Sequence, residues 1–339
     1  THRFITLRHD TLPLCACQAS GSRSLSAEYA RHVKAIVTKD FGGPEMLELG
    51  EVPDPVVGEG EVLLEVAAAG VNRADLLQRQ GFYPPPPGVS DVIGLEVSGT
   101  VDGEPVCALL AGGGYAQRVA VPRGQVMPLP PGVDLLVAGG IPEVACTVYS
   151  NLAMTAGLAP GERVLIHGGG SGIGTFAIQW ARAIGASVAV TAGGQEKLDR
   201  CAELGAQTLI NYREQDFVEA GPFDVILDVV GAKYLDANVR ALADGGRLVV
   251  IGLQGGVKAE LNLGTLLSKR GAVMATSLRT RSASQKAAIC AAVVEHVWPL
   301  YADGSIRPVV DRVLPLALAG DAHRLLAESG HFGKVVLEV

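Results

Sequence analysis

The sequence predicts an α/β protein built from a small β-rich part and a doubly wound parallel sheet. Residues 33–144 contain short apolar strands separated by glycine and proline turns. From about Ala145 onward, short apolar strands alternate with helical stretches, as in a parallel sheet covered on both faces. At 339 residues, the chain is long enough for two such parts, each with its own core.

Composition narrows the class of protein. Hydrophobic residues make up 48% of the chain and charged residues 19%, which is typical of a compact protein and not of a disordered one. A net charge of −7, with no Lys/Arg-rich run, argues against a nucleic-acid partner. No apolar run reaches the roughly 18 residues of a membrane span, so no membrane association is expected. The six cysteines form no C-x-x-C pair, which favours a reducing, cytoplasmic location.

The first 32 residues differ from the rest of the chain. They contain several Arg and Ser residues and few acidic ones, as a transit peptide does. A cloning remnant or a translated upstream stretch explains the segment equally well. Because the chain begins with Thr1, we expect it to be incomplete or processed. Residues 1–32 are therefore treated as an N-terminal extension outside the fold prediction.

The β-rich part contains two clear strand candidates and one extended loop. Residues 33–37 and 61–67 have the apolar, β-branched composition of strands. Residues 83–88 contain four consecutive prolines and must form an extended loop, because proline ends regular structure. The last residues, 334–339, form a further strand that we expect to return to this part.

The second part has the alternating pattern of a parallel sheet. Residues 173–184 place their apolar side chains on one helical face, and residues 197–204 form a second helix closed by Gly205. The last predicted strand lies late in the sheet and is a candidate edge, which a second copy of the chain could cover. The predicted strands are residues 163–167, 187–191, 224–228, 247–251 and 272–276.

A glycine-rich turn between the first strand and the first helix carries the strongest functional signal. Gly172-x-Gly174-x-x-Ala177 fits the dinucleotide-binding fingerprint, and the run of glycines also allows a register shifted by a few residues. Glycines let the backbone approach a pyrophosphate, and the helix N-terminus offers free N–H groups. A purely structural turn is the alternative, but the flanking strand–helix–strand context favours a dinucleotide. The candidate phosphate contacts are Gly169, Ser171, Gly172, Ile173 and Gly174.

The end of the second strand indicates which dinucleotide binds. An acidic residue about 20 positions past the glycines would hold the ribose 2′-hydroxyl of NAD. Ala192 and Gly193 occupy this place and leave room for a 2′-phosphate, while Lys197 can supply a positive partner. Glu196 argues the other way, but we expect it to face solvent. The pattern therefore predicts NADPH.

Several further motifs carry a family resemblance over residues 33–339. With the glycine turn, they resemble zinc-independent medium-chain dehydrogenase/reductases of the quinone oxidoreductase branch, closest to the subgroup that contains the tumour-suppressor-inducible quinone oxidoreductase. Two segments, residues 99–107 and 219–224, are shorter than the family pattern, through truncated loops or missing residues. The motifs are Asn72-Arg-Ala-Asp75, Gln80-Gly-Phe-Tyr-Pro-Pro-Pro86, Gly94-Leu-Glu-Val-Ser-Gly99, Asn211-Tyr212, Val250-Ile-Gly252 and Thr276-Ser-Leu-Arg-Thr-Arg281.

The resemblance implies a GroES-like catalytic domain formed by residues 33–144 and 279–339, with a Rossmann domain of residues 145–278 inserted. It also implies NADPH in the cleft between the domains and a homodimer. Carried over by motif, the residues at the reacting end would be Asn72, Tyr83 and Thr147. The implied cofactor contacts are Gly193, Lys197 and Tyr212 on the 2′-phosphate side, Val230, Gly231, Gly252 and Leu253 at the nicotinamide, and Ser277, Arg279, Gly333 and Lys334 around it. Tyr212 could instead be an ordinary strand-end tyrosine, and Asn72 a turn residue.

The family's zinc ligands have no counterpart in this chain. Zinc relatives carry Cys-His near position 72 and Gly-His-Glu near position 94, where this chain has Asn72-Arg73 and Gly94-Leu95-Glu96. We therefore expect no metal. Glu96 is expected to be a buried carboxylate paired with a nearby cation.

Without a metal there is no Lewis acid to polarise an alcohol, so the substrate should already be electrophilic. A quinone that accepts hydride from NADPH fits best. An enone or enoyl thioester is the alternative, with Tyr83 as the proton donor. A different class, an NADPH-binding sensor or structural protein with little turnover, also fits. Scattered histidines such as His167 and His296 are expected to be structural.

Overall fold

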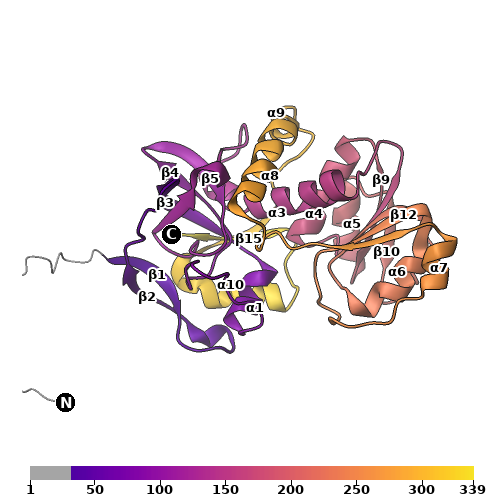
Figure 1. Cartoon of the computed structure of the whole chain (residues 1–339), viewed down its shortest axis with the longest axis horizontal. Coiled ribbons are helices and arrows are strands. Elements are labelled where there is room, and N and C mark those ends of the chain that lie inside the picture. Colours follow the sequence, from indigo (N-terminus) through magenta and orange to yellow (C-terminus); the bar gives the residue numbers. More distant parts are fainter. Residues whose placement is uncertain (1–31) are drawn as a thin grey trace, which may run out of the picture. The chain divides into compact units, whose positions relative to one another are not determined.

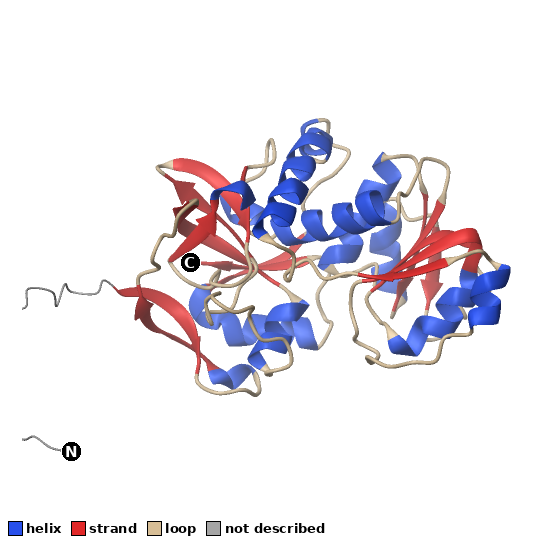
Figure 2. Ribbon diagram, viewed as in Figure 1, coloured by secondary structure: helices blue, strands red, loops and turns tan. Residues whose placement is uncertain are grey.

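Two large β-sheets organise residues 32–339, which are the residues that the computed structural model describes (Figures 1 and 2). The N-terminal extension predicted over residues 1–32 lies, except for His32, outside the described residues. In the part of the chain that is described, no helix is both long enough and apolar enough to cross a membrane.

The first sheet has six parallel strands in the order β10-β9-β8-β11-β12-β13. Numbered from β8, this is the 3-2-1-4-5-6 order of the Rossmann fold, which confirms the predicted parallel sheet. The five predicted strands are all present, β13 is an edge strand as expected, and β10 is an additional strand. The strands are β8 (Arg163–His167), β9 (Ser187–Ala192), β10 (Thr208–Asn211), β11 (Phe223–Asp228), β12 (Leu242–Val250) and β13 (Ala272–Ala275).

Helices cover this sheet, and the first of them follows the glycine turn. Helix α4 (Gly172–Ala183) buries Phe176, Ala177 and Trp180 against β8 and β9, as the apolar periodicity predicts. Helix α5 (Gln195–Glu203) ends before Gly205, whose φ of 110° suits glycine. The remaining elements are η4 (Ala232–Tyr234), α6 (Leu235–Ala241) and α7 (Leu263–Ser268).

The second sheet has seven strands in the order β14-β15-β3-β4-β5-β7, and β6 also pairs with β3. Strand β15 (Lys334–Glu338) runs antiparallel to β3 (Glu61–Val71), so the chain end returns to the first part as predicted. The predicted strand at 33–37 is β1 (His32–Thr38), which pairs only with β2 (Leu47–Pro53). The other strands are β4 (Glu96–Val101), β5 (Glu104–Leu109), β6 (Arg118–Pro122), β7 (Val126–Pro128) and β14 (Val310–Pro315).

Helices α3 and α8 join the two sheets into one core. The largest apolar cluster contains Met127 from the second sheet, Cys146 and Cys290 from these helices, and Val188 from the parallel sheet. The helices and short turns of this part are η1 (Pro44–Met46), α1 (Arg73–Arg79), η2 (Arg123–Gln125), α2 (Leu135–Ala138), α3 (Pro142–Val148), the π-helical turn η3 (Tyr149–Thr155), α8 (Ala283–His296), α9 (Trp298–Ala302), η5 (Leu316–Leu318) and α10 (Ala319–Ala327).

One of the two shortened segments closes as a tight hairpin. Strands β4 and β5 are joined by Asp102-Gly103, with Val101 opposite Glu104. Both turn residues have positive φ, 54° and 84°, as a type I′ turn requires. This two-residue turn closes the hairpin without the longer linker of the family pattern.

Candidate active site

The glycine turn wraps the start of α4 at the carboxyl end of β8. The amides of Gly168 and Gly169 donate to Thr191 O at 3.1 and 2.9 Å. Ser171 Oγ caps the helix by accepting from the Gly174 N–H at 3.0 Å. Strand order reverses between β8 and β11, so this turn lies at the switch point where such sheets bind ligands.

The structure sets the register of the fingerprint three residues earlier than Gly172-x-Gly174-x-x-Ala177. Gly172 is already the first residue of α4. A Cβ at Gly174 would overlap Gly168 O and lie 2.6 Å from Gly169 C, so Gly174 is the glycine required for close helix–turn packing. In this register, which the glycine run allows, Gly169 and Gly174 stand at the first and third glycine positions and Ser171 stands at the second.

The C-terminal segment lies directly against this turn. Gly333 N donates to Gly170 O at 2.9 Å, and Gly333 forms a bridge with Ser171. Gly333 has a φ of 92°, and a Cβ there would overlap Val309 O, so only glycine fits. The structure thus brings Gly333 to the candidate phosphate contacts.

At the end of β9, Gly193 faces the hydroxyl of Tyr212. A Cβ at Gly193 would lie 2.7 Å from that hydroxyl oxygen, and Tyr212 is exposed. Lys197, early in α5, is close to the turn, but its Nζ donates to Ser329 O at 2.5 Å and His331 O at 2.8 Å. Glu196 is exposed, as predicted. Lys197 therefore holds the C-terminal segment in this structure.

The loops after β11 and β12 bring together the four residues implied for the nicotinamide end. A Cβ at Gly231 would lie 2.9 Å from Leu253 Cδ2, and one at Gly252 would lie 2.7 Å from Val229 O. The carboxylate of Asp228 accepts from Val230 N at 2.6 Å and Gly231 N at 3.0 Å. Sequence reasoning did not single out Asp228, although an aspartate that ends a buried strand before a glycine loop is a signal for such a role.

Asp228 belongs to a buried polar network that includes His167. Burial raises the pKa of Asp228 to about 6, against the opposing effect of its three hydrogen-bond donors. Asn238 donates to Asp228 at 3.1 Å and faces His167 Nε2 at 2.8 Å, while His167 Nδ1 contacts Thr191 Oγ1 at 3.0 Å. Burial lowers the pKa of His167 to about 4, so this ring is neutral and structural, as expected.

At the place where the resemblance puts the reacting end, Asn72, Glu96 and Lys334 form one buried cluster. Lys334 Nζ lies 2.6 Å from Glu96 Oε1 and 2.7 Å from Asn72 Oδ1, and Asn72 Nδ2 donates to Glu96 Oε1 at 2.9 Å. Glu96 is 0% exposed. This confirms the prediction that Glu96 is a buried carboxylate paired with a cation. The ammonium of Lys334 forms this ion pair. The methylene groups of the same side chain lie close to the glycine turn.

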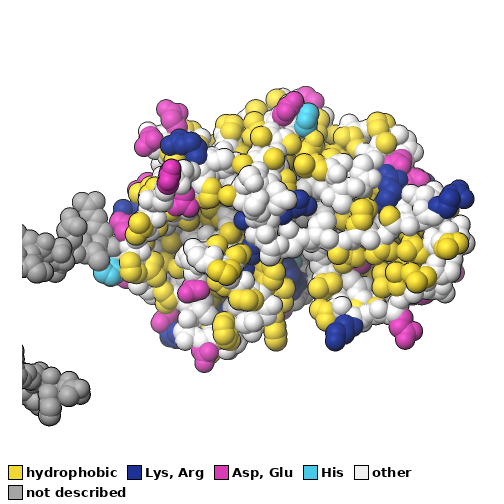
Figure 3. All heavy atoms as spheres, viewed as in Figure 1, with side chains coloured by type: hydrophobic (Ala, Val, Ile, Leu, Met, Phe, Trp, Pro, Cys, Tyr) yellow, Lys and Arg dark blue, Asp and Glu magenta, His cyan; other side chains and the backbone are white. Residues whose placement is uncertain are grey.

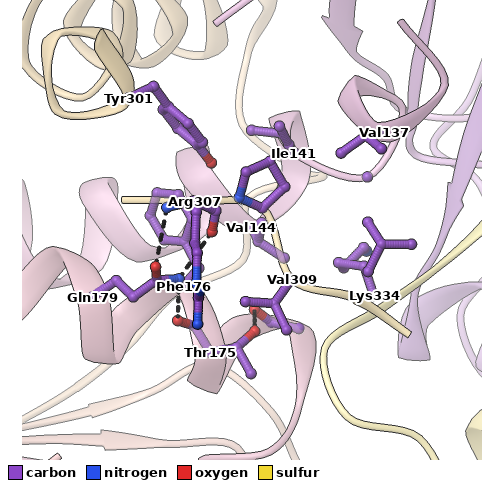
Figure 4. A pocket seen from close by; sticks show the side chains of 14 residues that line it. Val137, Ile141, Val144, Thr175, Phe176, Gln179, Tyr301, Arg307, Val309 and Lys334 are labelled. Atoms are coloured by element: carbon purple, nitrogen blue, oxygen red, sulfur yellow. Dashed lines mark hydrogen bonds between the residues drawn. The ribbon is translucent and has the colours of Figure 1, made fainter. Parts of the chain in front are cut away.

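The same side chain of Lys334 lines a separate pocket behind the glycine turn (Figure 4). This pocket lies between α2, α3, α4 and residues 307–310. Gln179 crosses it and donates to Thr175 O and Arg307 O. Asn72, Tyr83 and Thr147 do not line it, so the reacting end lies elsewhere.

Thr147 sits on α3 next to a carboxylate that the sequence interpretation missed. Thr147 Oγ1 donates to Glu143 Oε1 at 3.0 Å, and Glu143 N donates to Glu96 Oε2 at 2.9 Å. Both α3 residues therefore belong to the same cluster as Asn72 and Lys334. The i, i+4 spacing of Glu143 and Thr147 was the available signal, because it places both side chains on one helix face.

Tyr83, Ser277 and Arg279 form a third group. Tyr83 Oη lies 3.2 Å from Ser277 Oγ. Arg279 is only 5% exposed, and its guanidinium donates to Ala111 O at 2.7 Å, Tyr83 O at 3.1 Å and Gln78 Oε1 at 2.7 Å. Through these hydrogen bonds Arg279 anchors the Tyr83 loop.

The sheet order, the glycine turn at its switch point and the second, β-rich sheet define a dinucleotide-binding oxidoreductase fold. Residues 58–104 match the alcohol dehydrogenase GroES-like domain, and residues 204–337 match the zinc-binding dehydrogenase domain. The quinone oxidoreductase of Lama guanicoe is 32% identical over 331 residues, covering 91% of this chain and 98% of that protein.

Solved structures give the same result. The quinone oxidoreductase of Thermus thermophilus, solved alone and with NADPH, is 37% identical, with a TM-score of 0.78 over 90% of this chain and 100% of that one. An NAD-dependent alcohol dehydrogenase is 29% identical, with a TM-score of 0.79 over 90% of this chain and 99% of that one. This chain belongs to the medium-chain dehydrogenase/reductase family, in its quinone oxidoreductase branch. It is therefore an oxidoreductase that uses a nicotinamide cofactor.

Proposed function

We propose that this protein reduces quinones with NADPH and without a metal ion. The observation that carries the proposal is the cluster of Asn72, Glu96 and Lys334. The ammonium of Lys334, 2.6 Å from the fully buried carboxylate of Glu96, occupies the carboxylate oxygen that a metal ion would need as a ligand. Without a Lewis acid, an acceptor that is already electrophilic is the fitting substrate. The names of the Lama guanicoe and Thermus thermophilus relatives support the same substrate class.

The residues at the carboxyl ends of the parallel strands fit a dinucleotide phosphate. The turn at 169–174 offers the free amides of the α4 N-terminus to a pyrophosphate. The loops at 228–231 and 250–253 lie at the carboxyl ends of the next two strands, where the nicotinamide half would lie. Bound NADPH would supply the hydride. The protein's own groups align the acceptor and keep water away from it.

NADPH is the proposed cofactor because β9 ends at Ala192 and is followed by Gly193, so no carboxylate stands at the strand end to hold a ribose hydroxyl. We expect calorimetry to show tighter binding of NADPH than of NADH. Lys197→Gln keeps a donor for Ser329 O and His331 O but removes the charge, so it should weaken NADPH about tenfold, or about 1.4 kcal/mol. NADH should be unaffected by this change. Equal losses for both cofactors would contradict the assignment; the exposed neighbour Glu196→Gln is the control.

A panel of acceptors tests the reaction itself. In the presence of a strong chelator, NADPH should be consumed with 1,4-benzoquinone and 9,10-phenanthrenequinone and much more slowly with a crotonyl thioester. Tyr83→Phe should change quinone turnover by less than about tenfold, because the Tyr83 hydroxyl is paired with Ser277 Oγ and is not expected to be the proton donor. A thousandfold loss in Tyr83→Phe, with unchanged NADPH affinity, would support the enoyl reductase alternative. Tight NADPH binding with no turnover of any acceptor would support a sensor.

We also propose that the protein forms a homodimer through the β13 edge. Apolar side chains gather on the surface over α6 and α7 (Figure 3). Leu263 and Leu267 of α7 are 68% and 79% exposed. An apolar edge of this kind is usually covered, and a second copy of the chain would bring two such edges together. Light scattering at micromolar concentration measures this assembly, and a monomer would contradict it.

A further inference from the structure

Glu143 is the carboxylate of the reacting-end cluster that the proposed function leaves unused. It is half-buried and lies one helical turn before Thr147 on α3, whereas Thr147 itself is 7% exposed. The only side-chain hydrogen bond that involves Glu143 in residues 32–339 is the 3.0 Å contact with Thr147 Oγ1. A carboxyl group and a hydroxyl group joined in this way can pass a proton between them.

The charges around Glu143 favour its protonated form. Two carboxylates, Glu96 and Glu143, share one ammonium, that of Lys334. Glu96 has three donors, from Lys334 Nζ, Asn72 Nδ2 and Glu143 N, at 2.6, 2.9 and 2.9 Å. None of these three groups donates a hydrogen bond to the side-chain carboxylate of Glu143. Burial first, and then the charge of Glu96, raise the pKa of Glu143 to about 7, against the opposing effects of Lys334 and Thr147.

The two other candidate proton donors, Asp75 and Tyr83, are hydrogen-bonded to other groups. Asp75 is fully buried and accepts from Asn72 N at 2.7 Å and from Tyr115 Oη at 3.0 Å. Tyr83 Oη pairs with Ser277 Oγ. Among the described residues, Glu143 is thus the carboxylic acid whose side chain is hydrogen-bonded to the hydroxyl of Thr147.

We propose that Glu143 is the proton source for the reduced substrate and that Thr147 Oγ1 delivers the proton. The inference rests on the proposed quinone reduction. When Glu143 is ionised, Thr147 donates to it. When Glu143 is protonated, its O–H donates to Thr147 Oγ1, and the hydroxyl hydrogen of Thr147 is free to point at the substrate.

The proton and electron balance is complete. Hydride addition reduces the quinone to a hydroquinone monoanion and oxidises NADPH to NADP⁺. The oxyanion takes the proton of Thr147 Oγ1, while Thr147 takes the proton of Glu143. A proton from bulk solvent then restores the protonated Glu143 carboxyl group. The net reaction consumes one quinone, one NADPH and one proton, and it yields hydroquinone and NADP⁺.

A pH profile tests this role. Because the donor must be protonated, wild-type kcat should be highest below pH 7 and should fall as the pH rises through the pKa of Glu143, about 7. Glu143→Gln should lower kcat at pH 6 by about 100-fold and should remove this pH dependence, with NADPH affinity unchanged. Thr147→Val should have the same effect, and the double variant should lose no more than either single variant. Thr147→Ser, which restores the hydroxyl, should recover the wild-type profile.

A series of acceptors separates proton delivery from structural damage. Halogenated benzoquinones give weaker hydroquinone bases, so the loss caused by Glu143→Gln should shrink along the series. A structural defect would lower turnover equally for every acceptor and would overturn the inference. Glu104→Gln, at an exposed glutamate of the β4–β5 hairpin, is the matched control. No quinone reduction by the wild type would overturn the proposed function and this inference together. Normal wild-type turnover with an unchanged Glu143→Gln profile would overturn the inference alone.

Discussion

Lys334→Met should lower the free energy of unfolding by about 3–5 kcal/mol, the usual loss when one partner of a buried ion pair is removed. The reason is the position of Glu96, which is 0% exposed and has Lys334 Nζ as its cationic partner at 2.6 Å. Methionine fills a similar volume but leaves that charge unpaired, and it removes the contacts with Asn72 Oδ1 and Val71 O. Denaturant unfolding followed by circular dichroism measures the loss.

A surface pair provides the matched control for this substitution. Lys39 pairs with Glu48, but both side chains are about half exposed. Lys39→Met should therefore cost no more than about 1 kcal/mol. The double variant Lys334→Met/Glu96→Gln should recover much of the lost stability, because no charge remains buried without a partner. If Lys334→Met cost no more than Lys39→Met, the pair would not have the structural role assigned to it.

Gly174→Ala should weaken NADPH binding by about 100-fold, the upper end of the roughly 1–3 kcal/mol that overpacking costs. A Cβ at this position would overlap Gly168 O and lie 2.6 Å from Gly169 C, and both are backbone atoms of the turn itself. The turn must then move away from α4, which displaces the amides that would hold the pyrophosphate. Calorimetry with NADPH measures the loss.

Gly194→Ala is the control for this glycine. Gly194 lies at the start of α5, and a Cβ there would meet nothing within 4 Å. Its φ of 174° is extended backbone that alanine also adopts. NADPH affinity should therefore remain near that of the wild type. Equal affinities for the Gly174→Ala and Gly194→Ala variants would show that the turn tolerates a side chain and is not a close-packing site.

The local elements around the turn could be predicted from the sequence because each has a short-range cause. Strand β8 matches its predicted residues 163–167, since three consecutive apolar residues, Val164 to Ile166, stand just before a run of glycines. The helix predicted from 173 begins one residue earlier, because Ser171 caps it. The absence of an acid after β9 and the exposed position of Glu196 were likewise visible in the order of residues.

The sequence by itself therefore determined the two kinds of sheet, the phosphate-binding turn and the pairing of Glu96 with some cation. Only the tertiary structure decided that this cation is Lys334, 238 residues away. It also decided that Arg279 anchors the Tyr83 loop, that Lys197 holds the C-terminal segment, and that Glu143 lies between Glu96 and Thr147. The physical reason is the distance along the sequence over which each interaction acts. Periodicity and capping act over a few residues, whereas a buried side chain takes whichever partner the packing of distant elements brings within hydrogen-bond distance.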